Sequence, residues 1–480
     1  MPWNIHQTLE EEKKFRIPPG FQFPPDMGEP IPPRVFTSTY FDSEHHRLGQ
    51  LGLTLRKRVE QSHGVWQLKI PSGGNRLELE IASGSRSIPW EFQDLLWSFF
   101  RKQEAVQLGK LRTRRKGVHI RKDGQVLAEV VLDSVALIRD KTVVHSFQEV
   151  EVELQEGTAA QLKPIRKILL HAGAEEKPLQ PKIFQALQLS YPLTVEFSDS
   201  SAPPSDHIRE RLHSQYLQML QNDPGTRLGR DSEALHQMRV ATRRMRAIIR
   251  AVSSFLAPEW TEQVRQELGW IGSLLGEVRD WDVLFEFFRQ NFHDFSSPEQ
   301  RSYQTILKNF EDQSSVARAK LLEGLRSDRY LNLLNHFEDS LNHLPFQPTP
   351  LTLTEIARTA FHKVQDFANT SDSLFRKFEL HHTRRLLKRA RYAVELAEPF
   401  LGKRAKRFIQ QAKVAQDLLG RHQDAVVAEQ RLLAFKQHSR GTGIAYVTGL
   451  MVERLRNLQS QVHQQIPKQW EKLEKQGKKL

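Results

Sequence analysis

Charged side chains recur at every second position in several segments of the first half of the chain. The two clearest rows are Glu10, Glu12 and Lys14, and Glu149, Glu151 and Glu153. Successive side chains of a strand point to opposite faces, so each row would share one face. Carboxylate oxygens suit hard divalent cations, and guanidinium and ammonium groups suit phosphate oxygens. Such rows could together bind a metal ion and a phosphate chain.

Basic residues follow the same alternation in neighbouring segments. The further rows are Arg56 with Arg58, Lys69, Arg76 with Glu78 and Glu80, Arg112 with Arg114, and Glu129 with Asp133. For a single strand, a solvated outer face is the simpler interpretation. Taken together, the dense charges of both signs and two segments typical of covering helices, 90–100 and 162–171, favour a barrel with its charged faces inward. A charged lumen is costly without partners, which phosphates and metal ions would supply.

The second half is predicted to be a helical bundle with an internal repeat. His236-x2-Arg239-x3-Arg243-x2-Arg246 recurs as His381-x2-Arg384-x3-Lys388-x2-Arg391, and Leu274-Leu275-Gly276 recurs as Leu418-Leu419-Gly420. Each basic motif lies along one face of a helix, where like charges repel. One stripe alone would be a solvated face, but two matched stripes predict an anionic ligand. The two histidines could bind phosphate or orient helices through Asp280 and Asp424, and both roles stay open.

Length and composition limit the classes of protein to consider. The 480 residues suit two or three domains, and 39% hydrophobic with 26% charged residues suits a soluble globular protein. No apolar run approaches the ~20 residues of a membrane span, and the first residues do not resemble a signal peptide, so we expect a cytoplasmic protein without membrane contact. The lack of cysteine excludes disulfides, thiolate metal sites and cysteine nucleophiles. The net charge of +13 indicates a polyanionic partner.

The polar, proline-containing stretch near residue 200 predicts a boundary. We expect an N-terminal domain over 1–196, a linker over 197–205 and a C-terminal domain over 206–480.

The ordered motifs of the first half resemble the CYTH domain of the triphosphate tunnel metalloenzymes. They are Glu10-x-Glu12-x-Lys14, Tyr40-Phe41-Asp42, Leu55-Arg56-x-Arg58, Leu68-Lys69, Arg76-x-Glu78, Arg112-x-Arg114, Glu129-x3-Asp133, Glu149-x-Glu151-x-Glu153 and Pro181-Lys182. Ser43, Gln67 and Pro181 depart from the usual Thr, Thr and Ser. The resemblance implies an eight-stranded antiparallel β tunnel with covering helices that acts on tripolyphosphate-type substrates with Mg²⁺ or Mn²⁺.

The same resemblance implies roles for individual residues. The expected metal ligands are Glu10, Glu12, Glu149 and Glu151; the expected catalytic residues are Lys14, Lys69, Arg56 and Arg58; the expected substrate-binding residues are Arg76, Arg112, Arg114 and Lys182. For Glu153, Glu80 and Asp133, ion pairing and catalysis stay equally open, and no general base is assigned.

The helical half resembles the CHAD domain, whose members associate with inorganic polyphosphate. The motifs are Leu235-His236-x2-Arg239-Val240-x2-Arg243-Arg244-x-Arg246, Val278-Arg279-Asp280-x-Asp282-Val283 and Lys388-Arg389-x-Arg391-Tyr392. The resemblance implies that the basic helices line a pore or groove. The expected polyphosphate-binding residues are His236, Arg239, Arg243, Arg246, His381, Arg384, Lys388 and Arg391.

The sequence thus predicts a two-domain α+β protein that hydrolyses inorganic triphosphate to phosphate and pyrophosphate and binds polyphosphate. Two alternatives stay open: a non-catalytic polyphosphate-binding protein, and a phosphatase for an organic triphosphate such as thiamine triphosphate or a nucleotide. A nucleic-acid partner is not expected, because no aromatic residues interleave with the basic stripes for base stacking. The sequence does not decide the natural substrate, the metal or the oligomeric state. It also leaves open whether the helical domain delivers substrate to the tunnel or only localises the enzyme.

Overall fold

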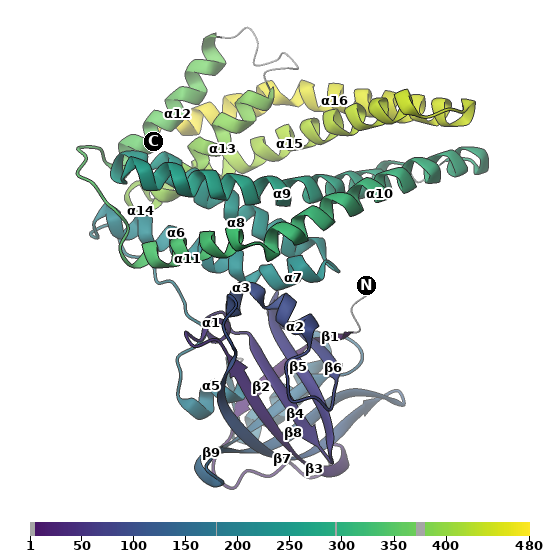
Figure 1. Ribbon diagram of the computed structural model, residues 1–480, viewed down its shortest axis with the longest axis vertical. Coiled ribbons are helices and arrows are strands. Elements are labelled where there is room, and N and C mark those ends of the chain that lie inside the picture. Colours follow the sequence, from purple (N-terminus) through teal and green to yellow (C-terminus); the bar gives the residue numbers. More distant parts are fainter. Residues whose placement is uncertain (1–4, 179, 293–294, 371–379) are drawn as a thin grey trace. The chain divides into compact units, whose positions relative to one another are not determined.

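The computed structural model describes residues 5–178, 180–292, 295–370 and 380–480. The chain divides into two compact units, Met1–Thr194 and Val195–Leu480 (Figure 1). Within the described ranges, no helix has both the length and the apolar character needed to cross a membrane.

The first unit is built on one antiparallel sheet. Its strands are β1 (His6–Glu10), β2 (Glu12–Arg16), β3 (Glu29–Asp42), β4 (Thr54–Glu60), β5 (His63–Ser72), β6 (Asn75–Ala82), β7 (Val106–Lys122), β8 (Gln125–Arg139), β9 (Thr142–Leu154) and β10 (Glu175–Lys177). The strand order is β1-β6-β5-β4-β3-β7-β8-β9-β2-β10. The described residues therefore form ten strands rather than the predicted eight.

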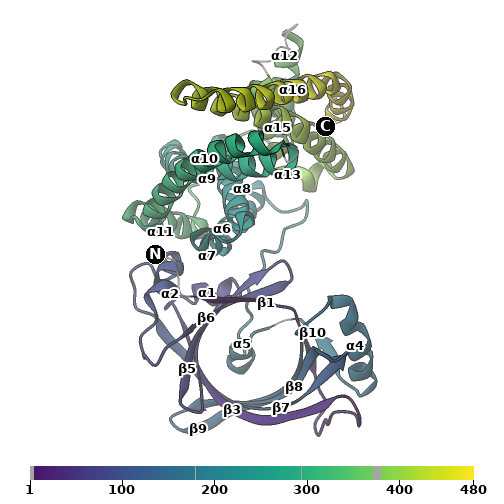
Figure 2. The same ribbon diagram turned by 90° about the vertical axis from the view of Figure 1, so that its right-hand side faces the viewer.

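The difference in strand count comes from the first segment of the sheet. β1 and β2 are consecutive and are interrupted only at Glu11. β1 pairs with β6, where Glu10 lies opposite Arg76, and β2 pairs with β9, where Lys14 lies opposite Glu151. One chain segment thus joins both ends of the sheet and closes it into a ring (Figure 2). The short β10 pairs with β2 and adds the remaining strand.

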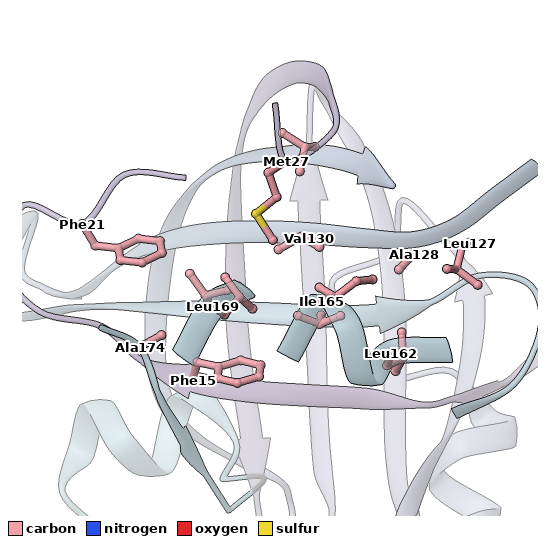
Figure 3. Packing of buried hydrophobic residues seen from close by; sticks show 13 residues of the cluster. Phe15, Phe21, Met27, Leu127, Ala128, Val130, Leu162, Ile165, Leu169 and Ala174 are labelled. Carbon is pink, nitrogen blue, oxygen red and sulfur yellow. The ribbon is translucent and has the colours of Figure 1, made fainter. Parts of the chain in front are cut away.

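Apolar residues on the outer face hold a helix against the barrel. Phe15, Val150 and Val152 belong to a buried cluster with Ile165 and Leu169 of helix α4 (Leu162–His171), as Figure 3 shows for its labelled members. Burying each such side chain contributes roughly 2 kcal/mol. Because alternate residues of these strands point inward, this packing turns their charged row into the barrel.

Short helices cover a second part of the barrel. They are α1 (Arg47–Gln50), α2 (Trp90–Leu95) and α3 (Trp97–Phe100). Phe92 and Leu95 of α2 and Phe99 of α3 are fully buried. Both segments predicted as covering helices, 90–100 and 162–171, are therefore confirmed as helical.

The Tyr40-Phe41-Asp42 motif connects strand β3 to these helices. Tyr40 lines the interior, and the ring centroid of Phe41 lies 5.2 Å from that of Trp66. The buried carboxylate of Asp42 accepts hydrogen bonds from the backbone N–H groups of Leu48 and Gly49, both at 2.9 Å. Asp42 therefore satisfies two amides in the first turn of α1 that would otherwise lack acceptors.

Helix α5 (Lys182–Leu187) lies inside the ring (Figure 2). Its Ile183 and Phe184 pack against Leu111 of β7 and Val135 of β8. At this part of the barrel the inward face of β7 is therefore apolar, and the intervening residues point outward.

The second unit is helical throughout its described elements apart from an isolated bridge between Leu256 and Phe346. Its helices are α6 (Pro204–Gln221), α7 (Asp223–Leu228), α8 (Ser232–Ala251), α9 (Pro258–Asn291), α10 (Ser297–Arg326), α11 (Asp328–Asn342), α12 (Leu353–Thr370), α13 (Leu380–Leu396), α14 (Glu398–Leu401), α15 (Lys403–His438) and α16 (Thr442–Gly477). The two basic motifs lie on α8 and α13. These two helices contact each other, and they pack on α9 and α15 respectively.

Candidate functional site

A cavity of about 260 Å³ in the barrel collects most of the charged residues predicted for the first domain. The predicted residues that line it are Glu10, Glu12, Lys14, Arg56, Arg58, Lys69, Arg76, Glu151 and Lys182. Glu149 is buried but does not appear in the lining; it lies behind Lys14 and Lys182, whose Nζ atoms are 3.6 and 3.1 Å from its Oε1.

One side of the cavity is organised around Lys69 of β5. Its Nζ donates to both carboxylate oxygens of Glu10, at 2.7 and 2.5 Å, and lies 3.4 Å from Glu78 Oε1. Burial raises the pKa of Glu10, and its hydrogen bond with Glu78 adds to this effect. For Glu78, burial also opposes ionisation, but the attraction of Lys69 and the other partners prevails and lowers the pKa. This carboxylate pair thus shares one lysine.

The opposite side is organised around Glu151 of β9. Lys14 and Lys182 each lie 2.5 Å from Glu151 Oε1, and Arg115 lies 3.0 Å from Oε2. Although burial opposes ionisation, Lys14, Lys182 and Arg115 hold the pKa of Glu151 well below its usual value. Arg115 and Lys182 also bind the fully buried Asp133, at 2.7 and 3.1 Å. Asp133 is therefore an ion-pair partner in this structure.

The predicted tunnel position of two arginines is wrong. Arg112 and Arg114 are exposed, on the face of β7 opposite to Leu111. The reason is α5: its apolar residues claim the inward face of this strand, so that the even-numbered residues point outward. Arg115 lines the cavity instead. Leu111 and Arg115 are four positions apart and share one strand face, but the sequence of β7 alone does not show that this face is the inward one.

Arg34 and Phe36 also line the cavity and were not predicted from the sequence, whereas Glu129 belonged to a predicted charged row. Arg34 and Glu129 form an ion pair at 2.7 Å near the cavity, and Gln67 accepts from Arg56 Nε at 2.7 Å. Phe36 lies beneath the guanidinium of Arg58, with 3.9 Å between the carbon of that group and the ring centroid. On β3, Arg34 shares its inward row with the aromatic residues Phe36 and Tyr40 rather than with further charges. The sequence therefore shows no charged alternation there.

The carboxylates have the chemistry of divalent-cation ligands, but they do not form a complete metal site by themselves. In the described parts of the chain, no three acidic or histidine side chains converge as a ready ligand set. Glu12 Oε1 and Glu149 Oε1 are buried there without a hydrogen bond. Burial, followed by the negative charge of Glu10, raises the pKa of Glu153. A cation would offset this repulsion, with phosphate oxygens completing its ligands.

A second cavity, of about 680 Å³, lies in the helical unit between the two basic motifs. The predicted residues that line it are His236, Arg239 and Arg243 of α8, and His381, Arg384, Lys388 and Arg391 of α13. Arg246 is exposed and lies outside the lining; its Nη2 is 3.2 Å from the point where a Cβ on Gly269 of α9 would lie. Arg244, Arg279 and Tyr392 also line the cavity; they belong to the motifs but were not among the expected binding residues. Lys413 lines the cavity as well and lies outside those motifs.

The repeated glycines lie beside the two arginine rows. A Cβ on Gly276 of α9 would lie 3.5 Å from Arg239 Nε, and one on Gly420 of α15 would lie 3.5 Å from Arg384 Nη2. Both distances are ordinary van der Waals contacts, so equivalent glycines lie against equivalent arginines in the two repeats. The Leu-Leu-Gly repeat belongs to the same site as the basic motifs.

Positive charge is concentrated in this cavity. Burial, together with Arg243 and Arg384, lowers the pKa of Lys388 to about 7. Arg239 Nη2 reaches Asp280 only at 3.4 Å. The Nε atoms of Arg243 and Arg384 and the Tyr392 hydroxyl are buried without hydrogen bonds in the described part of the chain. An unsatisfied buried donor costs about 1–3 kcal/mol, which an anionic ligand would offset.

The two histidines have different surroundings. Burial, followed by the charge of Arg279, lowers the pKa of His236 and favours its neutral form. His381 Nδ1 lies 3.2 Å from Gln423 Oε1. Among the described residues, neither histidine has a hydrogen bond to Asp280 or Asp424, the partners of the helix-orienting alternative, although both aspartates line the cavity.

Comparisons with known proteins agree with this two-part architecture. The CYTH domain family matches residues 9–180, and the CHAD domain family matches residues 210–433. Two curated proteins of Mycobacterium tuberculosis, both described as uncharacterized (MT2285 and Rv2226), are each 25% identical over 506 aligned positions, which cover 97% of this chain and 96% of theirs.

Solved structures also resemble part of the chain. PptA from Streptomyces chartreusis has a TM-score of 0.47 at 19% identity and covers 56% of this chain and 100% of its own. The CHAD domain from the plant Ricinus communis has a TM-score of 0.43 at 22% identity, over 56% of this chain and 95% of its own. The two family matches together span most of the sequence, and the chain accordingly belongs to the proteins in which a CYTH domain is followed by a CHAD domain.

Proposed function

We propose that the barrel hydrolyses inorganic triphosphate to phosphate and pyrophosphate with the help of Mg²⁺ or Mn²⁺, and that the helical cavity binds polyphosphate. The match to the CYTH family supports metal-dependent phosphoryl transfer as the kind of activity. The observation that carries the proposal is the convergence of basic and acidic side chains from most strands of the barrel on one small cavity.

The basic residues are suited to hold a phosphate chain. Guanidinium groups make forked contacts with phosphate oxygens, which suits Arg56, Arg58 and Arg76 to alignment of the chain. Lys14 and Lys69 are compact charges that would neutralise the phosphate oxygens. Phosphoryl transfer needs mainly alignment and charge stabilisation, so these residues would supply most of the catalysis.

The acidic residues would hold the metal ion. Glu10, Glu12 and Glu151 line the cavity from three strands, and Glu149 lies behind Lys14. A bound Mg²⁺ or Mn²⁺ would polarise the terminal phosphate and lower the pKa of an attacking water. In this structure the ammonium groups of Lys14 and Lys69 form ion pairs with Glu151 and Glu10. When substrate binds, they would turn toward its phosphate oxygens.

The aromatic lining favours an inorganic substrate. Phe36 and Tyr40 are the aromatic residues that line the cavity within the described ranges. Phe36 is covered by Arg58, and Tyr40, which is only 3% exposed, lies under the guanidinium of Arg56, whose central carbon is 5.9 Å from the ring centroid. Neither ring offers a free face to a nucleobase or a thiazole, which organic triphosphates would bring. The proposal therefore places inorganic triphosphate ahead of thiamine triphosphate and nucleotides.

The test is release of phosphate from tripolyphosphate, ATP and thiamine triphosphate by the full chain, with and without Mg²⁺ or Mn²⁺. We expect metal-dependent release that is fastest with tripolyphosphate. Faster release from an organic substrate would favour the organic phosphatase. No release from any of the three, combined with tight polyphosphate binding, would favour a non-catalytic binding protein.

The helical cavity supports polyphosphate binding separately. Its buried donors without partners and the lowered pKa of Lys388 both indicate a place prepared for negative charge. Titration of the full chain with polyphosphate and with duplex DNA tests the ligand class. We expect polyphosphate to bind more tightly at equal charge, and weaker binding after Arg243→Ser together with Arg384→Ser.

A further inference from the structure

Strand β7 carries a row of basic residues on the outside of the barrel. Lys110, Arg112, Arg114 and Lys116 are all exposed and alternate along one face. Alternate residues of a strand are about 6.8 Å apart, so the row extends over roughly 20 Å. We call these four residues the β7 row. The inward position of Leu111 keeps them out of the tunnel.

The β7 row has no acidic neighbours across the sheet. Arg114 lies opposite Val35 of β3 and Ser134 of β8, and Arg112 lies opposite Thr37 and Ala136. Lys110 lies between Thr39 and Ile138, and Lys116 lies opposite Leu132. Within the described ranges, none of the four side chains has a hydrogen bond or an ion pair.

Some exposed basic residues elsewhere on the barrel are paired, whereas others in the described part of the chain, such as Lys163 and Lys167 of α4, are not. Arg121 binds Glu29 at 2.7 Å, Arg166 binds Glu176, and Lys13 lies 3.6 Å from Glu176. The β7 row differs from all of these because its four charges of one sign share a single strand face and have only neutral residues opposite them. Four like charges on one face repel one another, and an extended anion lying along them would offset that repulsion.

This face is also open. Figure 2 shows the covering helices α1, α2 and α4 at other parts of the ring, away from β3 and β7. The residues beside the row are small or neutral, and Val35 is 55% exposed. An extended polymer could therefore lie along the strand without displacing another element.

We propose that the outer face of β7 binds an extended phosphate chain at a site separate from the tunnel. The ligand class rests on the proposed function, since the same domain would take phosphate chains into its interior. The residues paired across the sheet with the row include no aromatic ring, which disfavours single-stranded nucleic acid. The length of the row favours a chain longer than triphosphate, because only a longer chain contacts all four residues.

Lysine protection in the full chain tests the site directly. Lys110 and Lys116 are acetylated with an amine-reactive reagent, with and without long-chain polyphosphate, and acetylation is read by mass spectrometry. We expect several-fold protection of both lysines by long chains and none by tripolyphosphate. The exposed Lys163 on α4 is the matched control. Equal protection of Lys163, or no protection of Lys110 and Lys116 at saturating polyphosphate, would overturn the proposal.

A thymidine oligonucleotide of equal charge tests the ligand class. Protection equal to that by polyphosphate would overturn the assignment to a phosphate chain and indicate a nucleic-acid surface. Failure of the proposed hydrolysis has a different signature: tripolyphosphate would then not be cleaved, whereas long chains would still protect Lys110 and Lys116.

A variant gives a second readout. In a chain carrying Arg243→Ser and Arg384→Ser, we expect the further change Arg112→Ser with Arg114→Ser to weaken polyphosphate binding. The slope of log K against log salt should fall in magnitude by about 1.4, the value for two lost contacts with a single strand. Tripolyphosphate hydrolysis should not change. An unchanged slope would contradict the proposal.

Discussion

The Nζ of Lys182, on the helix inside the barrel, lies 3.1 Å from Oδ2 of Asp133 on strand β8. Asp133 is fully buried, and Lys182 also contacts Glu149 and Glu151. Apolar packing therefore holds helix α5 in place inside the barrel. Its Lys182 supplies a positive charge to the buried carboxylates of β8 and β9.

Replacement of Lys182 by Met should destabilise the protein. Asp133, Glu149 and Glu151 would lose a buried partner, and removal of one member of a buried ion pair costs about 3 kcal/mol. Urea unfolding followed by tryptophan fluorescence measures the change. The matched control is Lys163→Met on the surface of α4, which should change the stability little. Equal stability of the two variants would show that Lys14 and Arg115 suffice for these carboxylates.

Replacement of Glu10 or Glu12 by Ala should abolish metal-dependent phosphate release. Each change removes a carboxylate proposed to hold the metal ion, and we expect a loss of about a hundredfold or more in kcat. Binding of polyphosphate by the helical domain should persist. Glu11→Ala is the control, because Glu11 lies in the same segment but outside the cavity lining. Normal turnover by the Glu10 and Glu12 variants would refute the assignment of the metal ligands.

Polyphosphate affinity should fall as the pH rises above 7. In the free protein, burial and then Arg243 and Arg384 lower the pKa of Lys388 to about 7. A phosphate chain favours the charged lysine and raises this pKa, so binding takes up a proton above pH 7. The affinity is therefore highest below pH 7 and falls by at most about tenfold per pH unit, the limit for one proton.

Calorimetry in buffers of different ionisation enthalpy measures this proton uptake at constant ionic strength. Lys388→Arg keeps the charge at all pH values and should flatten the dependence, which leaves only the titration of the phosphate chain itself. An identical pH profile for both proteins would exclude Lys388 as the titrating group.

Replacement of Asp42 by Ala should destabilise the barrel unit. The change leaves the backbone amides of Leu48 and Gly49 without an acceptor, at a cost of about 2 kcal/mol. Chemical denaturation measures the loss. Glu44→Ala, two residues away and exposed, is the control and should be close to neutral. A similar midpoint for the two variants would mean that water replaces the carboxylate.

The alternation of charged and apolar residues was sufficient to predict which side chains of most strands point into the barrel. Glu151 and Arg56 point into the cavity because Val150, Val152 and Leu55 are needed for the outer packing. Period-2 patterning carries this information directly.

The failures have a common physical origin in contacts between distant segments. Arg112 was misplaced because the apolar partner of its strand, α5, lies inside the barrel, and nothing local to β7 reveals that. Arg246 satisfies the helical spacing of its motif but lies beside Gly269 on α9 rather than in the cavity. The spacing of a motif shows which residues share one face of a helix or strand. Which other elements pack against that face depends on tertiary structure.

The interruption at Glu11 has a consequence for the order of assembly. β1 pairs with β6, and β2 pairs with β9. This segment can therefore complete its pairing only after the chain as far as Leu154 has formed the sheet. Such long-range pairing is slow. Glu10 and Glu12 would thus enter the barrel at its last step. During refolding, hydrolytic activity should return together with closure of the ring, and an incompletely closed domain should be inactive.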